Sequence, residues 1–320
     1  MKIKKLYILI FFLFTCLLST NAQTFKIIKT PEERFKSLID YNFTPNYMLV
    51  DNNLEMHYID VGDKSNPIIL LLHGEPAWSY IYRNMIPILV QNGYRVIAPD
   101  LIGFGKSDKI IGFEQYTYTN HTKWVNHFIE KLELNNIKLY AHDWGGMIGL
   151  RIVAQQPHLF SHIIISDAFL FTGKEITPKS FKNWVKFAKN DVSFNAGTVM
   201  NWATNVNLSQ ETIKAYNAPY PNEEYMYGLR IFPSLIPTEE SDKEAKINLT
   251  LMDKLKILET PFLTIWGDNK DAMWLGKDKI LQLEINGAKN VNHQTIHANH
   301  FLQEDNPELL TEIILNFIKK

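Results

Sequence analysis

The feature that most constrains the fold of this chain is the segment 139–149, which reads LYAHDWGGMIG. Apolar residues at 137–141 predict a short strand, and a helix is expected to follow at once. Small residues, Ala141 and Gly145, stand two positions either side of Asp143. A sharp strand-to-helix turn leaves no room for bulky neighbours and pushes one side chain into a cleft. The segment therefore predicts a nucleophile elbow that presents Asp143.

The carboxylate of Asp143 has two interpretations. At such a turn it can attack carbon and form an ester, which water must later open. The helix N-terminus behind it supplies backbone N–H groups and a positive dipole end, which keep the carboxylate ionised. Alternatively, Asp143 is an ordinary N-cap residue, and the glycines that follow it serve packing.

Strands and helices alternate along most of the chain. Continuous apolar runs are typical of strands buried on both faces. Strands are expected at 54–61, 67–72, 95–98, 137–141, 162–166, 262–266 and 291–296, and helices at 79–91, 119–132, 146–156 and 307–318. This alternation predicts an α/β protein with a mostly parallel central sheet flanked by helices.

The strand pattern stops between residue 169 and about residue 249. Helical stretches cut by five prolines fill this segment, which we interpret as an inserted helical cap. The predicted organisation is a core domain of residues 23–168 and 250–320 and a cap domain of residues 169–249. Residues 30–47 are expected to form a polar N-terminal arm with one short helix.

The first 22 residues have the layout of a secretory signal peptide. Three lysines precede an apolar run at 6–18, and small residues follow at Thr20 and Ala22. The run is shorter than the roughly 20 apolar residues that a membrane-spanning helix needs. We expect residues 1–22 to be cleaved off and the mature protein to be secreted or periplasmic, without stable membrane insertion. An uncleaved anchor, or a lipoprotein modified at Cys16, is the alternative.

Composition narrows the range of partners. The chain is 46% hydrophobic and 21% charged, which is normal for a globular protein with a large core. Loss of the signal lysines lowers the basic residues from 33 to 30 against 34 acidic ones. This balance gives no electrostatic case for binding nucleic acid or an anionic membrane surface. The single cysteine lies in the signal segment, so no disulfide is expected, and we expect a monomer.

A histidine near the C-terminus is the candidate general base. His300 follows the last predicted strand, and its neutral imidazole could take a proton from water aimed at an ester on Asp143. Nucleophile, acid and histidine then follow the order of the α/β-hydrolase fold. A rival is a metal site, because His293, His297 and His300 would share one face of a helix. The strand predicted at 291–296 scatters these three histidines and disfavours that site.

Backbone donors for an oxyanion are expected beside the elbow. The strand 67–72 ends at His73, and the loop that follows can supply the N–H of Glu75, with a second N–H from Trp144. His73 is expected to brace this loop rather than to take part in catalysis. Asp100 is expected to hold the glycine-rich loop that follows strand 95–98.

These motifs resemble the haloalkane dehalogenases, specifically their subfamily I. The resemblance rests on the segments 73–80 (HGEPAWSY), 100–108 (DLIGFGKSD), 142–146 (HDWGG) and 300–305 (HFLQED), with the arm TPEERF at 30–35 and the cap segment APYPNEEY at 218–225. It covers essentially the whole mature chain. The elbow alone is shared with epoxide hydrolases, whereas Glu75 together with Trp78 is the more specific mark.

The resemblance implies hydrolysis of carbon–halogen bonds in small haloalkanes, with water as co-substrate, halide as product, and no cofactor or metal. A departing halide needs stiff N–H donors in an apolar cavity, and an indole N–H is rigid and only donates. Trp144 matches the first halide-binding residue of the family. Trp184 in the cap is the candidate for the second, with Trp202 as the substitute. The alternative is that Trp184 belongs only to an apolar helix stripe.

The catalytic acid is the point at which the chain departs from the family. The subfamily I acid follows strand 262–266, so the resemblance implies Asp271, but the loop GDNKD is one residue longer than usual. Asp268 is an alternative that stands close to the strand end. Asp167 is another, because other dehalogenase subfamilies place their acid at the end of strand 162–166.

Two rival functions remain open on the sequence. An epoxide hydrolase uses the same nucleophile and base, and its acidic groups are usually paired cap tyrosines. The cap offers Tyr216, Tyr220, Tyr225 and Tyr227 for that role, but Glu75 and the tryptophans favour the dehalogenase. A non-catalytic binding protein on the same fold is the rival of a different class, and an intact nucleophile, base and acid set argues against it.

Overall fold

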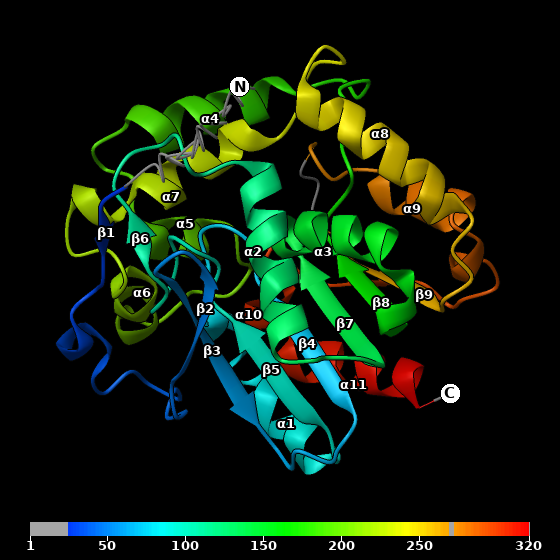
Figure 1. Cartoon of the computed structure of the whole chain (residues 1–320), viewed down its shortest axis with the longest axis horizontal. Coiled ribbons are helices and arrows are strands. Elements are labelled where there is room, and N and C mark those ends of the chain that lie inside the picture. Colours follow the sequence, from blue (N-terminus) through cyan, green and yellow to red (C-terminus); the bar gives the residue numbers. More distant parts are fainter. Residues whose placement is uncertain (1–24, 269–271, 320) are drawn as a thin grey trace, which may run out of the picture.

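The computed structural model describes residues 25–268 and 272–319. The predicted signal peptide and Asp271 therefore lie outside the described residues. Figure 1 shows a central twisted sheet, helices on both of its faces, and a further group of helices gathered at one end.

Within the described residues, eight strands form the main sheet. Their spatial order is β10 (Gln294–Ile296), β9 (Phe262–Gly267), β8 (Phe160–Ser166), β7 (Ile137–His142), β4 (Ile68–Leu72), β5 (Arg95–Pro99), β3 (Leu54–Val61) and β2 (Asn46–Asp51). All pairs from β10 to β5 are parallel, and β3 and β2 add antiparallel. Every residue of β7 and β9 is buried, as expected for strands covered on both faces. The predicted mostly parallel sheet is confirmed.

Helices cover both faces of this sheet. In Figure 1, α2 (Tyr118–Lys131) and α3 (Asp143–Gln155) lie in front of the strands, and α11 (Pro307–Ile318) is partly hidden behind them. α1 (Met85–Gln91) packs against α11, and α9 (Lys277–Glu284) packs against β9. α11 has the bounds that the sequence predicts.

The segment between β8 and β9 is helical, as its sequence indicates. It contains α4 (Lys179–Asn190), α5 (Ala196–Trp202), α6 (Gln210–Asn217), α7 (Tyr227–Ile231) and α8 (Lys243–Lys256). The arrowheads of β7 and β8 in Figure 1 point toward the end of the molecule where α4 and α7 lie. α8 packs against α3, so it joins the cap region to the sheet layer. The proposed boundary at residue 249 falls inside α8 and stays a prediction.

Some elements differ from the expectation. The helix expected over 79–91 is a 3-10 turn, Ser79–Tyr82, followed by α1. Pro87 has no N–H and fits only the first turn of an α-helix, so the helix starts at Met85. The last strand begins at Gln294 rather than at 291.

The N-terminal arm contributes more structure than its polar sequence indicates. It contains a 3-10 helix, Glu32–Phe35, and the first residues of the edge strand β2. Just before the arm, β1 (Ile27–Ile28) pairs with β6 (Lys109–Ile110) in a separate two-stranded sheet. These strands are short or half exposed, so their hydrophobic pattern is too weak to predict them.

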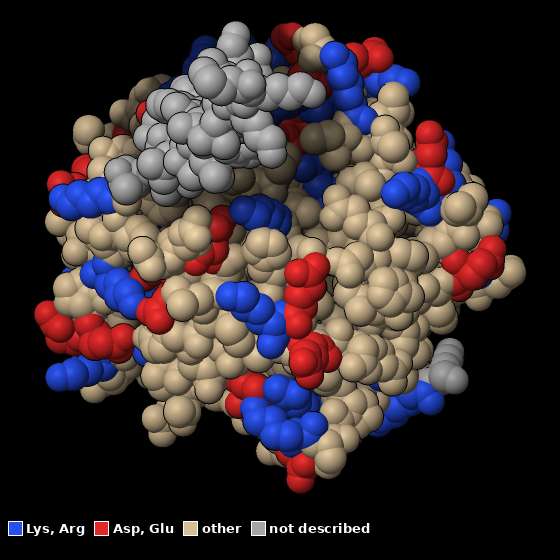
Figure 2. All heavy atoms as spheres, in the orientation of Figure 1, with Lys and Arg blue, Asp and Glu red and all other residues tan. Residues whose placement is uncertain are grey.

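Charged side chains are dispersed over the surface. On the face shown in Figure 2, Lys and Arg side chains alternate with Asp and Glu, and neither sign forms a continuous patch. Among residues 25–268 and 272–319, every helix is too short or too polar to span a bilayer.

Candidate active site

The predicted elbow is present at the junction of β7 and α3. Asp143 is the first residue of α3 and has a φ of 51°, the left-handed region that a side chain adopts only under local constraint. A Cβ on Gly145 would lie 2.1 Å from the carbonyl oxygen of Leu72, so only glycine allows α3 to start this close to β4. A Cβ on Gly74 would lie 2.4 Å from the Asp143 side chain. The small residues that the sequence places here are therefore steric requirements of the turn.

Two backbone N–H groups point at the Asp143 carboxylate. The N–H of Glu75 donates to Oδ1 at 2.8 Å, and the N–H of Trp144 donates to the same carboxylate. Burial by itself would raise the pKa of Asp143, but the neighbouring His300 and these N–H groups lower it below its usual value. The side chain is therefore an anion at neutral pH, with Oδ1 held by Glu75 and Oδ2 turned toward His300.

His300 lies between two carboxylates. Its Nε2 is 3.7 Å from Asp143 Oδ2, an ion-pair distance, and its Nδ1 is 3.3 Å from Asp167 Oδ2. Burial would lower the pKa of His300, but Asp143 and Asp167 outweigh it and raise the pKa to about 10. In the free protein the imidazole is therefore protonated.

The contacts of the candidate acids distinguish them from one another. Asp167 stands at the end of β8, is fully buried, and accepts the hydrogen bond from His300 Nδ1. Asp268 is half exposed and accepts from His297 Nδ1 at 2.9 Å, so it does not serve His300. Asp271, the predicted acid, lies in the segment outside the described residues, so its role stays a prediction.

The three histidines of the alternative metal site are held apart. His293 contacts Thr264 and the carbonyl of Ala288, and His297 is exposed and pairs with Asp268. Only His300 faces Asp143. Among the described residues these three do not form a common ligand set.

An apolar cavity of about 320 Å³ opens beside Asp143 and His300. Glu75, Phe181 and Pro233 line it together with four tryptophans, Trp144, Trp184, Trp202 and Trp274. The indole of Trp144 is fixed by an edge contact with Tyr118 and a tilted contact with Phe232, at ring-centroid distances of 5.1 and 4.8 Å. Its N–H has no acceptor among the described residues and is available to a ligand in the cavity.

Both cap tryptophans named from the sequence line this cavity. Trp184 is half-buried and packs on Phe194, whereas Trp202 is 61% exposed and packs on Phe187. An indole that is shielded from water binds an anion more strongly than one that is solvated. This difference supports Trp184 over Trp202 as the second halide donor.

Sequence reasoning did not identify Trp274 as a site residue. Its ring is parallel to that of His300, with centroids 5.8 Å apart and an interplanar angle of 6°. It stands only three residues beyond Asp271, in the loop already singled out for the acid. An aromatic residue so near a candidate acid is the signal that could have marked it.

The side chain of Glu75 is also part of the cavity wall. Burial raises the pKa of its carboxyl well above the usual range, and the charge of Asp143 adds to this effect. Both effects favour the protonated form of Glu75.

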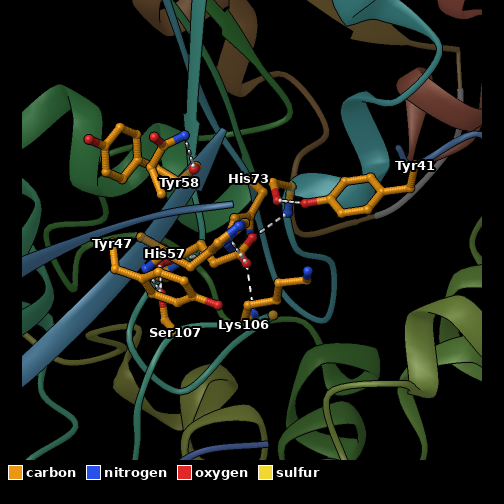
Figure 3. A network of polar contacts seen from close by, with 12 residues as sticks. Tyr41, Tyr47, His57, Tyr58, His73, Lys106 and Ser107 are labelled. Atoms are coloured by element: carbon orange, nitrogen blue, oxygen red, sulfur yellow. Dashed lines mark hydrogen bonds and ion pairs between the residues drawn. The ribbon is translucent and has the colours of Figure 1, made fainter. Parts of the chain in front are cut away.

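A buried network around Asp100 holds the loop after β4, which carries the N–H of Glu75 (Figure 3). The Asp100 carboxylate accepts from His57 Nδ1 at 2.7 Å, from the Ser79 N–H at 2.7 Å and from the Lys106 N–H at 2.8 Å. Burial alone would raise the pKa of Asp100, but these partners, His57 above all, lower it to about 2.

His73 braces the same region, as predicted. Its Nδ1 donates to the carbonyl of Gly74 at 2.9 Å, and its Nε2 accepts from the N–H of Leu101 at 2.9 Å. Both ring nitrogens are thus occupied by backbone groups. The structural roles assigned to His73 and Asp100 are confirmed.

Comparison with known proteins identifies relatives of this chain. A family model described as alpha/beta hydrolase fold matches residues 67–307. A haloalkane dehalogenase of Psychrobacter cryohalolentis is 43% identical, with 92% of this chain and 98% of that protein covered. One from Mycobacterium marinum is 41% identical over 90% of this chain and 98% of its own length. The tetrameric structure of haloalkane dehalogenase DpaA from Paraglaciecola agarilytica NO2 superposes with a TM-score of 0.82 at 33% identity, covering 92% and 98% of the two chains.

The elbow, the sheet order and the matched family model define a hydrolase of the α/β-hydrolase fold. Within that class, the identity to the curated relatives over nearly their whole length shows that the chain belongs to the haloalkane dehalogenases, hydrolases that act on carbon–halide bonds. The family expected from the sequence motifs is confirmed.

Proposed function

We propose that this enzyme cleaves haloalkanes through an alkyl ester on Asp143. The observation that carries this proposal is the Asp143 carboxylate, ionised, buried and facing an apolar cavity. In the first step Asp143 Oδ2 attacks the halogen-bearing carbon, the carbon–halogen bond breaks, and the halide leaves with the bonding electrons. The N–H groups of Trp144 and Trp184 receive the halide.

Water opens the ester in the second step. His300 takes a proton from the water, whose oxygen bonds to the ester carbonyl carbon. The N–H groups of Glu75 and Trp144 stabilise the resulting oxyanion, because both already donate to the Asp143 carboxylate in the free protein, Glu75 at Oδ1. When this intermediate collapses, the bond from its carbon to the alkyl oxygen breaks, and that oxygen takes the remaining proton of the former water. The alcohol leaves, the Asp143 carboxylate is restored, and His300 keeps the first proton until it passes to solvent.

The charges around His300 link the two steps. The free-protein pKa of about 10 depends on the negative charges of Asp143 and Asp167. Esterification neutralises Asp143, so the pKa of His300 falls in the alkyl-enzyme. The imidazole can then lose its proton and act as a base at the stage where a base is required.

The orienting acid can be tested at the ester stage. Asp271 is our proposed acid, and the contact with His300 Nδ1 supports Asp167 as its alternative. Loss of the acid slows ester hydrolysis by up to about 10⁴-fold, because the imidazole loses its correct tautomer. We expect this effect in Asp271→Asn, measured as decay of the alkyl-enzyme. Normal decay in Asp271→Asn with slow decay in Asp167→Asn would move the role to the end of β8.

Trp184→Phe tests the halide site. The substitution keeps an aromatic ring in the cavity wall but deletes the indole N–H that we propose binds the halide. A lost hydrogen bond to a buried charge costs about 1.5–3 kcal/mol, so dehalogenation should fall roughly ten- to a hundred-fold. Trp202→Phe is the matched control and should change the rate little. The opposite result for the two variants would assign the halide to Trp202.

Short bromoalkanes and epoxides together test the reaction type. We expect bromide from the first and no diol from the second, measured on the purified protein. The cap residues Tyr216, Tyr220, Tyr225 and Tyr227, all of them described, do not line the cavity, so the acids that an epoxide hydrolase uses are not at hand. Diol formation at a rate comparable to bromide release would contradict the assignment.

We propose cleavage after Ala22 and export of the mature chain, on the layout of residues 1–22 alone. Intact mass of the protein from the native host's culture fractions tests this. The monomer expected from the sequence has an alternative in the tetramer formed by DpaA. Light scattering during size-exclusion chromatography distinguishes these two states.

A further inference from the structure

The carboxylate of Asp305 binds two chain segments that are far apart in the sequence. Asp305 is half-buried at the end of the short helix α10 (Leu302–Asp305). Its Oδ1 accepts from the N–H groups of Asn205 and Val206, at 2.7 and 3.0 Å, in the loop that follows α5. Its Oδ2 accepts from the N–H of Asn299 at 2.6 Å, in the loop between β10 and α10. One carboxylate thus joins the cap to the loop of the catalytic histidine.

The two joined segments meet at the wall of the catalytic cavity. We call residues 297–301, which carry His300, the base loop, and residues 203–206 the cap loop. The cavity is lined by Ala203 of the cap loop and by Asn299, His300 and Phe301 of the base loop. The N–H of Phe301 donates to the carbonyl of Ala203 at 3.3 Å, a long hydrogen bond. The three bonds to Asp305 are shorter and reinforce this junction.

The helix that carries Asp305 is itself held firmly. Its neighbour Glu304 is buried, and its carboxylate accepts from both terminal nitrogens of the Arg83 guanidinium and from the hydroxyl of Tyr216 in α6. A bidentate pair between arginine and a carboxylate fixes the relative orientation of the two groups. Asp305 is therefore a fixed point to which the base loop is attached.

The attachment is passed directly to His300. The side chain of Asn299 accepts from the N–H of His300 at 2.9 Å, while the Asn299 N–H is bound by Asp305. The imidazole Nε2 of His300 is 3.7 Å from Asp143 Oδ2, so its reach to the ester depends on where the base loop lies. A displacement of about 1 Å at a reacting group can lower a rate about 100-fold.

We propose that Asp305 is a positioning residue that holds His300 in place for ester hydrolysis by tying the base loop to α10 and to the cap loop. This inference rests on the proposed function, because it concerns the second step of that reaction. Asp143 and Trp144 lie on α3 and Trp184 lies on α4, outside both loops. The first step, alkylation of Asp143, therefore does not require Asp305.

Asp305→Asn is the main test, because it keeps the size of the side chain and removes one acceptor. Two N–H groups point at Oδ1 and one at Oδ2, so the amide oxygen should stay with the cap loop. The amide nitrogen then faces the N–H of Asn299, and two donors cannot bond to each other. The base loop should lose its attachment while the cap loop keeps its own.

The measurements separate the two steps with a short bromoalkane as substrate. Decay of the alkyl-enzyme, followed by intact mass, should slow roughly ten- to a hundred-fold in Asp305→Asn. We expect a burst of about one bromide per chain, because bromide leaves before the slow step. With free bromide kept low, kcat/KM reports the steps up to bromide release and should equal the wild-type value, so kcat and KM should fall together.

Glu308→Gln is the matched control. This exposed acid stands three residues beyond Asp305, in the first turn of α11, and its loss removes the same charge. It should change neither ester decay nor kcat/KM. Asp305→Ala, which removes both acceptors, should slow ester decay at least as much as Asp305→Asn.

Two outcomes would overturn the inference. One is ester decay at the wild-type rate in both Asp305 variants. The other is a parallel fall of burst amplitude, kcat and kcat/KM, which shows a loss of folded protein rather than a misplaced base. Failure of the proposed function would look different, since the wild-type protein would then release no bromide and no variant would carry an alkyl adduct.

Discussion

Replacing Asp143 with alanine is expected to abolish halide release while leaving the fold intact. The carboxylate is the only nucleophile in the proposed mechanism, and loss of a nucleophile typically lowers kcat by several orders of magnitude. Residual bromide release should be below about a thousandth of the wild-type rate. Circular dichroism is the control for folding, because the N–H donors of Glu75 and Trp144 lose their acceptor.

Isotope labelling distinguishes the ester from direct attack by water. In the proposed scheme the water oxygen bonds to the carboxyl carbon of Asp143, and an oxygen of Asp143 leaves in the alcohol. A single turnover of the wild-type protein in H₂¹⁸O should therefore place the label in Asp143. Label found only in the alcohol, or substantial turnover by Asp143→Ala, would refute the covalent scheme.

His300→Gln is expected to preserve the first step and block the second. Gln cannot accept a proton from water, whereas Asp143 still attacks the substrate. We expect about one halide per chain, followed by arrest, and an alkyl adduct on Asp143 that persists in the intact mass. His300→Phe should behave in the same way if the packing on Trp274 is retained.

His297→Asn is the matched control for His300→Gln. Both histidines lie in the loop after β10, but the side chain of His297 is 82% exposed and contacts Asp268, not Asp143. Its loss should leave turnover unchanged. Steady multiple turnover in His300→Gln would show that another group activates the water.

Elements with a strong hydrophobic pattern were predictable from the sequence. The continuous apolar runs mark β4, β7 and β9, and the elbow follows from the small residues around Asp143. Weak patterns were not predictable: β2 is half exposed and β1 is two residues long. The start of β10 was also misplaced: the strand begins at Gln294, and His293 before it is bonded to Thr264 and Ala288 through its side chain.

The site residues likewise include some that a local sequence pattern predicts and some that it does not. Asp143, His300, Glu75 and Trp144 could be predicted because each stands at a fixed point next to a strand end. The role of the cap tryptophans was harder to predict, because apolar periodicity in a helix has the same appearance whether it serves packing or binding. Trp274 contacts His300, which is distant in sequence, so no local pattern marks it.

The alternation of buried strands and helices, the elbow and the family could all be predicted from residue size, hydrophobicity and motifs within short segments. Which side chains meet depends instead on the packing of distant segments. This packing paired Asp268 with His297 rather than with His300, and it brought Asp167 to His300. These contacts join residues up to 133 positions apart, and their distances are set by how the strand ends and loops pack, which no local sequence pattern encodes.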